Sequence, residues 1–202
     1  AEDTDAKFFD YDNDGDLDLY VASGSMTLAS GDRGLLDRIY KNNGRGGFSY
    51  DEEALPQLGV RSSSIAVADF DGDGLQDVFV AVRGVKGSYG MPASSLYLKN
   101  YGNGQLRNER RTTRSFQRLG MLTDCAAADI DNDGDMDLLS VGDWSGVRVW
   151  VNDGNAIFKE QTLERGFDHS QGLWNTMELA DVDGDGWMDI VAGNLGENCR
   201  LA

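Results

Sequence analysis

Four copies of one nine-residue pattern constrain the fold of this chain more than any other feature. Each copy reads Asp-x-Asp-x-Asp-Gly-x-x-Asp, and the copies occupy residues 10–18, 69–77, 129–137 and 181–189. Their first residues lie 52 to 60 residues apart. Self-similarity at such a period is the signature of a repeat protein, in which each repeat forms one supersecondary unit. We number the positions of each copy 1 to 9 and call each copy an Asp motif.

Two further markers keep the same register. The string Asn-x-Gly follows the first three Asp motifs at residues 42–44, 100–102 and 152–154, and a glycine precedes each later motif. A large apolar residue lies six positions after each of these Asn residues. These markers are Phe48, Leu106 and Phe158 for the apolar residue, and Gly59, Gly120 and Gly172 for the glycine. Agreement between independent markers indicates a true internal repeat.

The segments between the markers are typical of strands. They are short, rich in β-branched and aromatic residues, and bounded by Gly, Asn and Asp, as at 64–68, 78–82, 96–98, 138–141 and 147–151. Each repeat has room for four strands: one entering the Asp motif, one leaving it, one ending at Asn-x-Gly and one starting at the large apolar residue. Four antiparallel strands that recur at this period predict a β-propeller blade.

The predicted fold is therefore all-β, with four-stranded antiparallel propeller blades. We expect three complete repeats at about 5–60, 61–120 and 121–172 and a partial fourth at 173–202, as a segment of a larger propeller. Alanine precedes three of the four motifs, which suits innermost strands crowded around an axis. Open blade edges leave self-association as a further expectation, because unpaired strand edges invite pairing.

The Asp motifs predict bound cations. Carboxylates at positions 1, 3, 5 and 9 of a tight loop repel one another unless a cation neutralises them. Oxygen ligands without His or thiolate favour Ca²⁺. Glycine at position 6 allows a sharp turn with positive φ, and position 7 varies, so we expect its backbone carbonyl to be the ligand. The predicted ligands of about four Ca²⁺ ions are Asp10, Asp12, Asp14, Asp16, Asp18, Asp69, Asp71, Asp73, Leu75, Asp77, Asp129, Asp131, Asp133, Asp135, Asp137, Asp181, Asp183, Asp185, Trp187 and Asp189.

Two alternatives to calcium sites apply to these loops. An EF-hand requires Glu at its twelfth position, but the four copies have Val21, Val80, Ser140 and Ala192 there, between predicted strands. Metal-free Asp-Gly turns are the other alternative, yet simple turns do not require four carboxylates in register.

The overall charge narrows the possible partners. The 202 residues include 35 acidic and 18 basic side chains, a net charge of −17, and the motifs hold 18 of the acidic residues. Such a field repels nucleic acid and anionic lipid, so neither is expected as a partner. No apolar run approaches the length of a membrane span, so membrane insertion is not expected.

Catalysis is not expected from the remaining residues. His169 is the single histidine, and its neighbours Asp168 and Ser170 diverge in direction along the chain, so they cannot form a triad. Five arginines, at positions 107, 110, 111, 114 and 118, form the one basic stretch, read either as a solvated edge or as a docking patch.

The long loops 23–37 and 83–95 are candidate ligand-binding loops, because recognition residues favour loops on rigid scaffolds. Trp144 and Trp174 are expected to pack between blades, with stacking on sugars as the alternative. Cys125 is predicted to be a buried thiol, and a bond to Cys199 stays open.

The Asp motifs resemble the FG-GAP/VCBS repeats of calcium-binding, integrin-α-like β-propellers. More narrowly, residues 37–40, 120–124, 142–144, 174–175, 193–196 and 198–200 resemble bacterial secreted proteins associated with ASPIC/UnbV domains. The resemblance implies an extracellular or cell-surface location, structural Ca²⁺ held by the Asp residues at positions 1, 3, 5 and 9, and recognition or adhesion of a protein or glycan ligand without catalysis. The alternative is a Ca²⁺-dependent polysaccharide-binding or lyase propeller. The integrin-type FG…GAP tetrad is missing, and the sequence stops soon after the second strand of repeat four.

Overall fold

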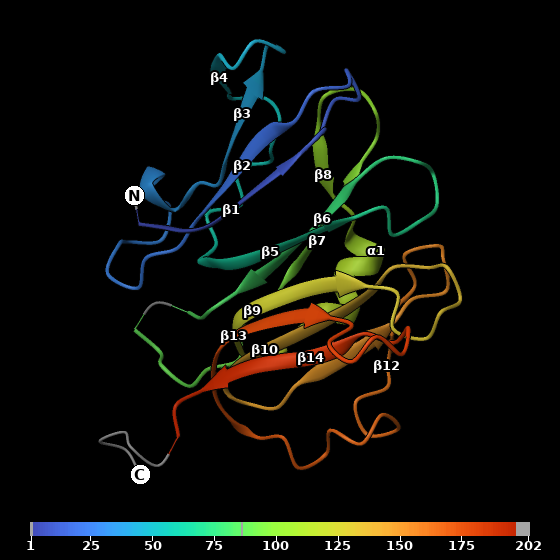
Figure 1. The fold of residues 1–202 in the computed structure, drawn as a ribbon. Coiled ribbons are helices and arrows are strands. Elements are labelled where there is room, and N and C mark those ends of the chain that lie inside the picture. Colours follow the sequence, from blue (N-terminus) through green and yellow to red (C-terminus); the bar gives the residue numbers. More distant parts are fainter. Residues whose placement is uncertain (1, 86, 197–202) are drawn as a thin grey trace.

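The computed structural model describes residues 2–85 and 87–196, whose regular elements are antiparallel strands apart from three short helices (Figure 1). Blade one contains β1 (Asp3–Phe9), β2 (Asp18–Ser23), β3 (Arg38–Asn42) and β4 (Phe48–Asp51). Blade two contains β5 (Ser62–Ala68), β6 (Asp77–Val82), β7 (Leu96–Asn100) and β8 (Leu106–Asn108). Blade three contains β9 (Met121–Ala128), β10 (Asp137–Ser145), β11 (Arg148–Val151) and β12 (Lys159–Glu160), and β13 (Gly172–Ala180) and β14 (Asp189–Asn194) begin a fourth. The prediction of three blades and a partial fourth is confirmed.

Within each blade the strands pair in chain order, and the first strands of successive blades lie side by side (Figure 1). The hairpin register is the same in every blade, because the residue before the Asp motif pairs with the Asp at position 9. These pairs are Phe9↔Asp18, Ala68↔Asp77, Ala128↔Asp137 and Ala180↔Asp189. Each Asp motif is therefore the closing loop of an innermost hairpin, at the same end of every blade.

Aromatic residues fill the space between blades two and three. Phe116 packs edge-on against Phe79, with ring centroids 4.9 Å apart, and against Trp150 at 5.8 Å. Phe158 contacts Phe70, the residue at position 2 of the second Asp motif, at 5.5 Å. Phe70 is fully buried, so this residue anchors its Asp loop to the core of the molecule.

The arginine-rich stretch forms helical turns. Arg107 lies in the outer strand β8, whereas α1 (Arg110–Thr113) and η2 (Arg114–Phe116) connect blade two to blade three. A third short helix, η1 (Arg33–Leu35), lies in the loop after β2. The turn is needed to insert Phe116 into the core, where it is fully buried. None of the helices in the described ranges is long and apolar enough to cross a membrane.

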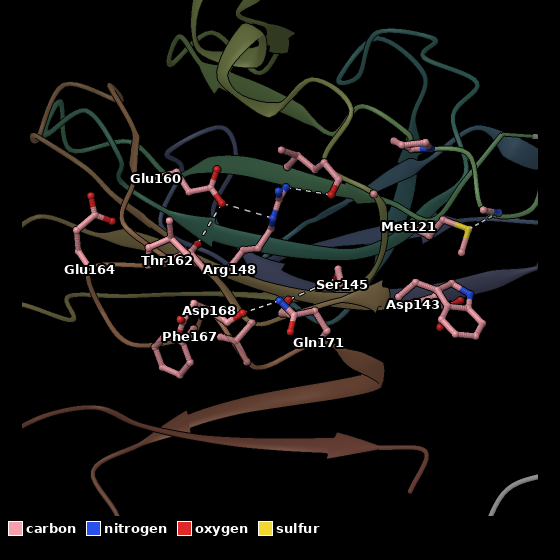
Figure 2. Close-up of a pocket in the computed structure, with 18 residues that line it drawn as sticks. Met121, Asp143, Ser145, Arg148, Glu160, Thr162, Glu164, Phe167, Asp168 and Gln171 are labelled. Carbon is pink, nitrogen blue, oxygen red and sulfur yellow. Dashed lines mark hydrogen bonds and ion pairs between the residues drawn. The ribbon is translucent and has the colours of Figure 1, made fainter. Parts of the chain in front are cut away.

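The end of the blades opposite the Asp motifs carries the longer connections. Each second strand starts at position 9 of a motif and runs away from it, so the loops that follow β2, β6 and β10 gather at this opposite end. A cavity of about 640 Å³ lies there, lined by residues of blades two and three and by the connection to the fourth blade (Figure 2).

Candidate metal centres

The carboxylate at position 1 accepts hydrogen bonds from backbone N–H groups of its own loop. Asp10 accepts hydrogen bonds from the backbone N–H groups of Asp14 at 3.2 Å and Gly15 at 2.9 Å, and Asp69, Asp129 and Asp181 accept the corresponding bonds in their loops. Positions 4 and 6 both adopt positive φ. The values at position 4 are 61° (Asn13), 72° (Gly72), 58° (Asn132) and 78° (Gly184), and those at position 6 are 94° (Gly15), 85° (Gly74), 97° (Gly134) and 91° (Gly186). The predicted turn at position 6 is confirmed, and Asn or Gly at position 4 suits the same left-handed region.

The Asp at position 9 joins the Asp motif to the Asn-x-Gly marker. Asp77 accepts a hydrogen bond from the backbone N–H of Asn100 at 2.7 Å, and Asp137 accepts one from that of Asn152 at 2.8 Å. The side-chain amide of Asn152 in turn donates to the carbonyl of Phe70 in the preceding blade at 2.7 Å. The two sequence markers keep register because they form one bonded unit that also links neighbouring blades.

Burial changes the acidity of these carboxyl groups. The side chains at position 9 of the first three loops are fully buried. Desolvation raises the pKa of Asp77 and of Asp137 to about 6, and it also raises the pKa of Asp18. Ionisation of these groups at neutral pH therefore costs free energy, and a bound cation would offset that cost.

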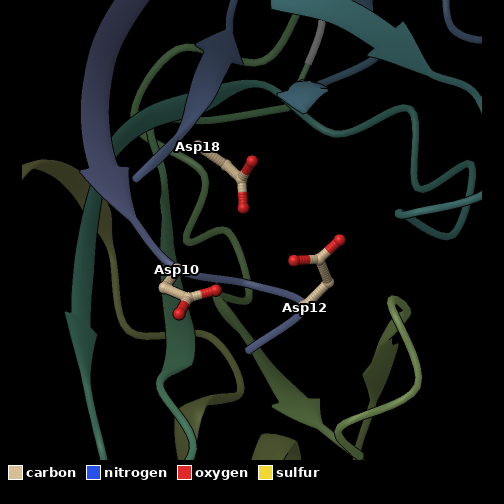
Figure 3. Close-up of side chains that lie close together, drawn as sticks. All are labelled: Asp10, Asp12 and Asp18. Atoms are coloured by element: carbon tan, nitrogen blue, oxygen red, sulfur yellow. The ribbon is translucent and has the colours of Figure 1, made fainter. Parts of the chain in front are cut away.

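Positions 1, 3 and 9 converge in all four loops. Each offers one carboxylate oxygen, and the three oxygens lie within 4.8 Å of one another. Figure 3 shows this arrangement in the first loop, where the three side chains surround a common space. The converging sets are Asp10, Asp12 and Asp18; Asp69, Asp71 and Asp77; Asp129, Asp131 and Asp137; and Asp181, Asp183 and Asp189.

The structure does not bring position 5 into these sets. Asp14, Asp73, Asp133 and Asp185 each accept a hydrogen bond from the backbone N–H at position 7, at 3.2, 3.0, 2.9 and 2.9 Å. Position 7 is occupied by Asp16, Leu75, Asp135 and Trp187, and burial raises the pKa of Asp16 and Asp135. Ligation by the position 5 carboxylate and by the position 7 carbonyl stays a prediction.

Basic side chains that the sequence analysis missed contact three of the loops. Lys41 contacts Asp12 and lies 3.1 Å from Asp14, and Lys99 contacts Asp71 and lies 2.7 Å from Asp73. Burial opposes the charge on Lys99, but its hydrogen bonds to the two carboxylates raise its pKa. In the third loop Arg165, from a different part of its blade, lies 2.9 Å from Asp131. The sequence feature that could have indicated the two lysine contacts is a lysine directly before the Asn-x-Gly string in the first two repeats.

The residues present fit a hard cation. One oxygen of each position 3 carboxylate in the first three loops, Oδ1 of Asp12, Asp71 and Asp131, is buried and has no hydrogen-bond partner among the described residues. A buried carboxylate oxygen without a partner is costly, and these three belong to residues of the converging sets. Because every donor in the set is a carboxylate oxygen, the sites suit Ca²⁺ better than zinc or copper.

Several other predicted residues have clear places in the structure. Trp144 is 61% exposed, so its expected packing between blades is wrong, whereas Trp174 is half-buried and packs against the core of blade three. The side chain of His169 is exposed and lies 3.4 Å from Asp168. Cys125 is buried in β9, as predicted, and Cys199 lies outside the described residues.

The fold and the loops define a class: a segment of a β-propeller whose blades carry acidic loops of one design. The family described as FG-GAP-like repeat matches residues 10–80 and 129–192, and the FG-GAP repeat matches residues 62–105. The chain belongs to the FG-GAP-like repeat family. The narrower likeness to ASPIC/UnbV-associated proteins stays a prediction.

Comparison with individual proteins supports the fold alone. No curated protein matches this chain. Among solved structures it is similar to an Agrocybe aegerita lectin whose structure is described as the basis of specific recognition of non-reducing terminal N-acetylglucosamine. The identity is 20% and the TM-score 0.52; the match covers 92% of this chain and 45% of the lectin chain. This chain thus spans about half the length of the lectin chain.

Proposed function

We propose that this chain is a calcium-stabilised recognition module of an extracellular or cell-surface protein. The observation that carries the proposal is the convergence of three carboxylates in each of four loops. In three of the loops, one buried carboxylate oxygen has no hydrogen-bond partner within residues 2–85 and 87–196. FG-GAP repeats typically occur in extracellular proteins, where calcium is abundant, and this setting supports the assignment of location.

The chain's own residues explain how such a site would stabilise a blade. The carboxylate at position 1 folds the loop through backbone N–H groups, and the carboxylate at position 9 fixes the third strand through Asn100 or its equivalents. Ca²⁺, when bound, supplies the positive charge that lets these carboxylates stay ionised side by side. The predicted consequence is a rigid scaffold that holds the loops at the opposite end of the blades.

Recognition of a glycan or protein ligand, without catalysis, is the role that we propose for those loops. The lectin to which the fold is similar is a recognition protein, and the loops after β2 and β6 are long. A net charge of −17 also opposes nucleic acid as the ligand.

Calorimetric titration of the metal-stripped chain with Ca²⁺ and with Mg²⁺ tests the proposal. We expect saturable Ca²⁺ binding at up to four sites, matching the four carboxylate sets, and weaker Mg²⁺ binding. Asp71→Asn should remove or weaken one site, because it withdraws a charge and an oxygen from the second set. Glu53→Gln, which removes an equal charge at an exposed position of blade one, is the control. Absence of Ca²⁺ binding in the stripped protein would refute the proposal.

A further inference from the structure

The cavity at the end opposite the Asp motifs is built from four separate connections. Its lining comes from the loop after β6, the start of β9, the hairpin between β10 and β11, and the segment that leads to β13 (Figure 2). Its volume of about 640 Å³ falls within the range typical of small-molecule sites, about 300 to 1,000 Å³. The four connections lie on two adjacent blades and the start of a third, so the cavity depends on correct docking of the blades.

An exposed tryptophan in a strained conformation borders this cavity. Trp144 lines it, is 61% exposed and has a φ of 61°, a left-handed conformation that is unfavourable for a bulky side chain. Its indole N–H donates to the hydroxyl of Tyr89, from the loop after β6, at 3.3 Å. Tyr89 is itself 67% exposed. Strain at an exposed aromatic residue adds nothing to packing, and such strain clusters at ligand-binding positions.

The end of β10 that carries Trp144 packs closely against its neighbours. A Cβ atom at Gly142 would lie 2.3 Å from the carbonyl oxygen of Met121, and one at Gly146 would lie 2.4 Å from Oγ of Ser170. Between them, the buried side chain of Asp143 forms an ion pair with Arg83 at 3.1 Å. The indole is therefore presented from a fixed backbone, which reduces the entropy lost on binding.

The polar lining of the cavity disfavours an anionic ligand and offers hydrogen-bonding groups to a neutral one. Four of the lining side chains are acidic: Asp143, Glu160, Glu164 and Asp168. Among the described residues that line the cavity, Arg148 carries the basic side chain. It forms an ion pair with Glu160 at 3.5 Å and donates a hydrogen bond to the carbonyl of Leu119 at 3.0 Å. The acidic excess repels anions, while carboxylates and the amide of Gln171 offer acceptors and donors for hydroxyl groups.

We propose that this cavity binds a neutral hexopyranose residue of a glycan, with one face of the sugar ring on Trp144 and its hydroxyls facing the polar wall. An aromatic platform beside hydroxyl-binding groups matches a ring that is apolar on its face and polar at its edge. The inference deepens the proposed recognition role, and it depends on residues remote from the Asp motifs.

The test uses the calcium-saturated chain and methyl glycosides of the common neutral hexoses, N-acetylhexosamines and hexuronic acids. Saturation-transfer NMR identifies binders, and calorimetry gives the affinity. We expect at least one neutral glycoside to bind saturably and the uronides to bind at least about tenfold more weakly, a difference of about 1.4 kcal/mol. Trp144→Gly should lower the affinity at least as much, yet leave the fold intact, because glycine adopts positive φ without strain.

Tyr50→Ala, at an exposed aromatic residue of blade one, should bind the sugar as the unaltered chain does. Absence of binding by every neutral glycoside would overturn the inference, as would unchanged affinity in Trp144→Gly or a preference for uronides. Failure here leaves the Ca²⁺ titration unaffected. Conversely, Trp144-dependent sugar binding by a chain that takes up no Ca²⁺ would sustain this inference and refute the calcium role.

Discussion

At the scale of single residues, the Asp at position 9 combines two roles. It fixes the third strand of its blade by accepting a backbone hydrogen bond, and it supplies one oxygen to the converging carboxylates. Because the pKa of Asp77 in the folded chain is raised to about 6, this group favours folding at low pH and loses that contribution as pH rises through about 6. A cation at the site would oppose that loss.

The Lys99 ammonium group and a bound cation would compete for the carboxylates of the second loop. Its ammonium group contacts the carboxylates of Asp71 and Asp73, so it partly neutralises the loop and must yield some of this contact to a cation. We expect Lys99→Met to destabilise the metal-free chain and to raise the Ca²⁺ affinity of this loop by up to about tenfold, equivalent to about 1.4 kcal/mol. Calorimetric titration measures the affinity.

Lys159→Met is the matched control, since Lys159 lies on the exposed outer strand of blade three. It should leave Ca²⁺ affinity unchanged apart from the small gain due to overall charge. A lower Ca²⁺ affinity in Lys99→Met would show that this lysine assists the site and would contradict the competition.

The sequence predicted much of each loop but not its basic partners. Spacing and residue type indicated the carboxylates and the glycine turn at position 6, because both act through local backbone geometry. The contacts of Lys99 and Arg165 depend on strand pairing and on long side chains that reach across a blade. Arg165 lies 34 residues from Asp131, so no local pattern links them.

At the scale of strands, polar side chains fasten successive innermost strands together. The residue five positions before each Asp motif is Asp5, Ser64, Asp124 or Thr176, so carboxylate and hydroxyl alternate. Ser64 donates to Asp124 at 2.7 Å, and Thr176 donates to the same carboxylate at 3.0 Å. The backbone N–H of Met177 also donates to Asp124, at 2.8 Å. Blades two, three and four therefore meet at one side chain.

Asp124→Asn should weaken this junction. An amide keeps the size of the side chain but replaces one acceptor oxygen with a donor, which leaves hydrogen-bond donors of a neighbouring blade unpaired. We expect a loss of about 1 to 3 kcal/mol in the free energy of unfolding, measured by urea denaturation at saturating Ca²⁺.

Asp32→Asn is a suitable comparison, because this exposed residue caps η1 and Asn caps as well as Asp. It should unfold at the same urea concentration as the unaltered chain. If Asp124→Asn also matched the unaltered chain, the junction would contribute nothing to stability.

The strands were predictable because their sequence pattern recurs in every repeat. Features that occur in only one repeat were not predictable. Phe116 and its helical turn occur in one repeat, inside an arginine-rich stretch without strand or helix periodicity. Trp144 was expected to pack because large aromatic residues are usually buried, but it lies in β10 at a register shift between the pairs Asp143↔Leu173 and Ser145↔Gly172, and its side chain is exposed. The repeat was visible in the sequence, whereas the positions of Phe116 and Trp144 depend on tertiary contacts.

At the scale of the whole molecule, the two ends of the blades differ in design. One end repeats the same acidic loop four times, and the other combines connections of unequal length into one cavity. The first was visible in the sequence because it repeats. The second could not be predicted, since its walls come from segments that meet only when the blades dock.

About half of the acidic residues lie at the end of the blades that carries the Asp motifs. The Asp motifs hold 18 of the 35 acidic residues, so four divalent cations would reduce the net charge from −17 to −9. Self-repulsion destabilises a compact chain, and cation binding should therefore act on the stability of the whole fold.

Thermal unfolding in EDTA, in Ca²⁺ and in Mg²⁺ tests this central claim most directly. A site held at 100 times its dissociation constant adds about 2.7 kcal/mol to the stability of the folded state, so several such sites should raise the midpoint by many degrees. The account predicts a large rise that is specific to Ca²⁺. The same midpoint in all three solutions, with elemental analysis showing that the protein contains no metal, would contradict it.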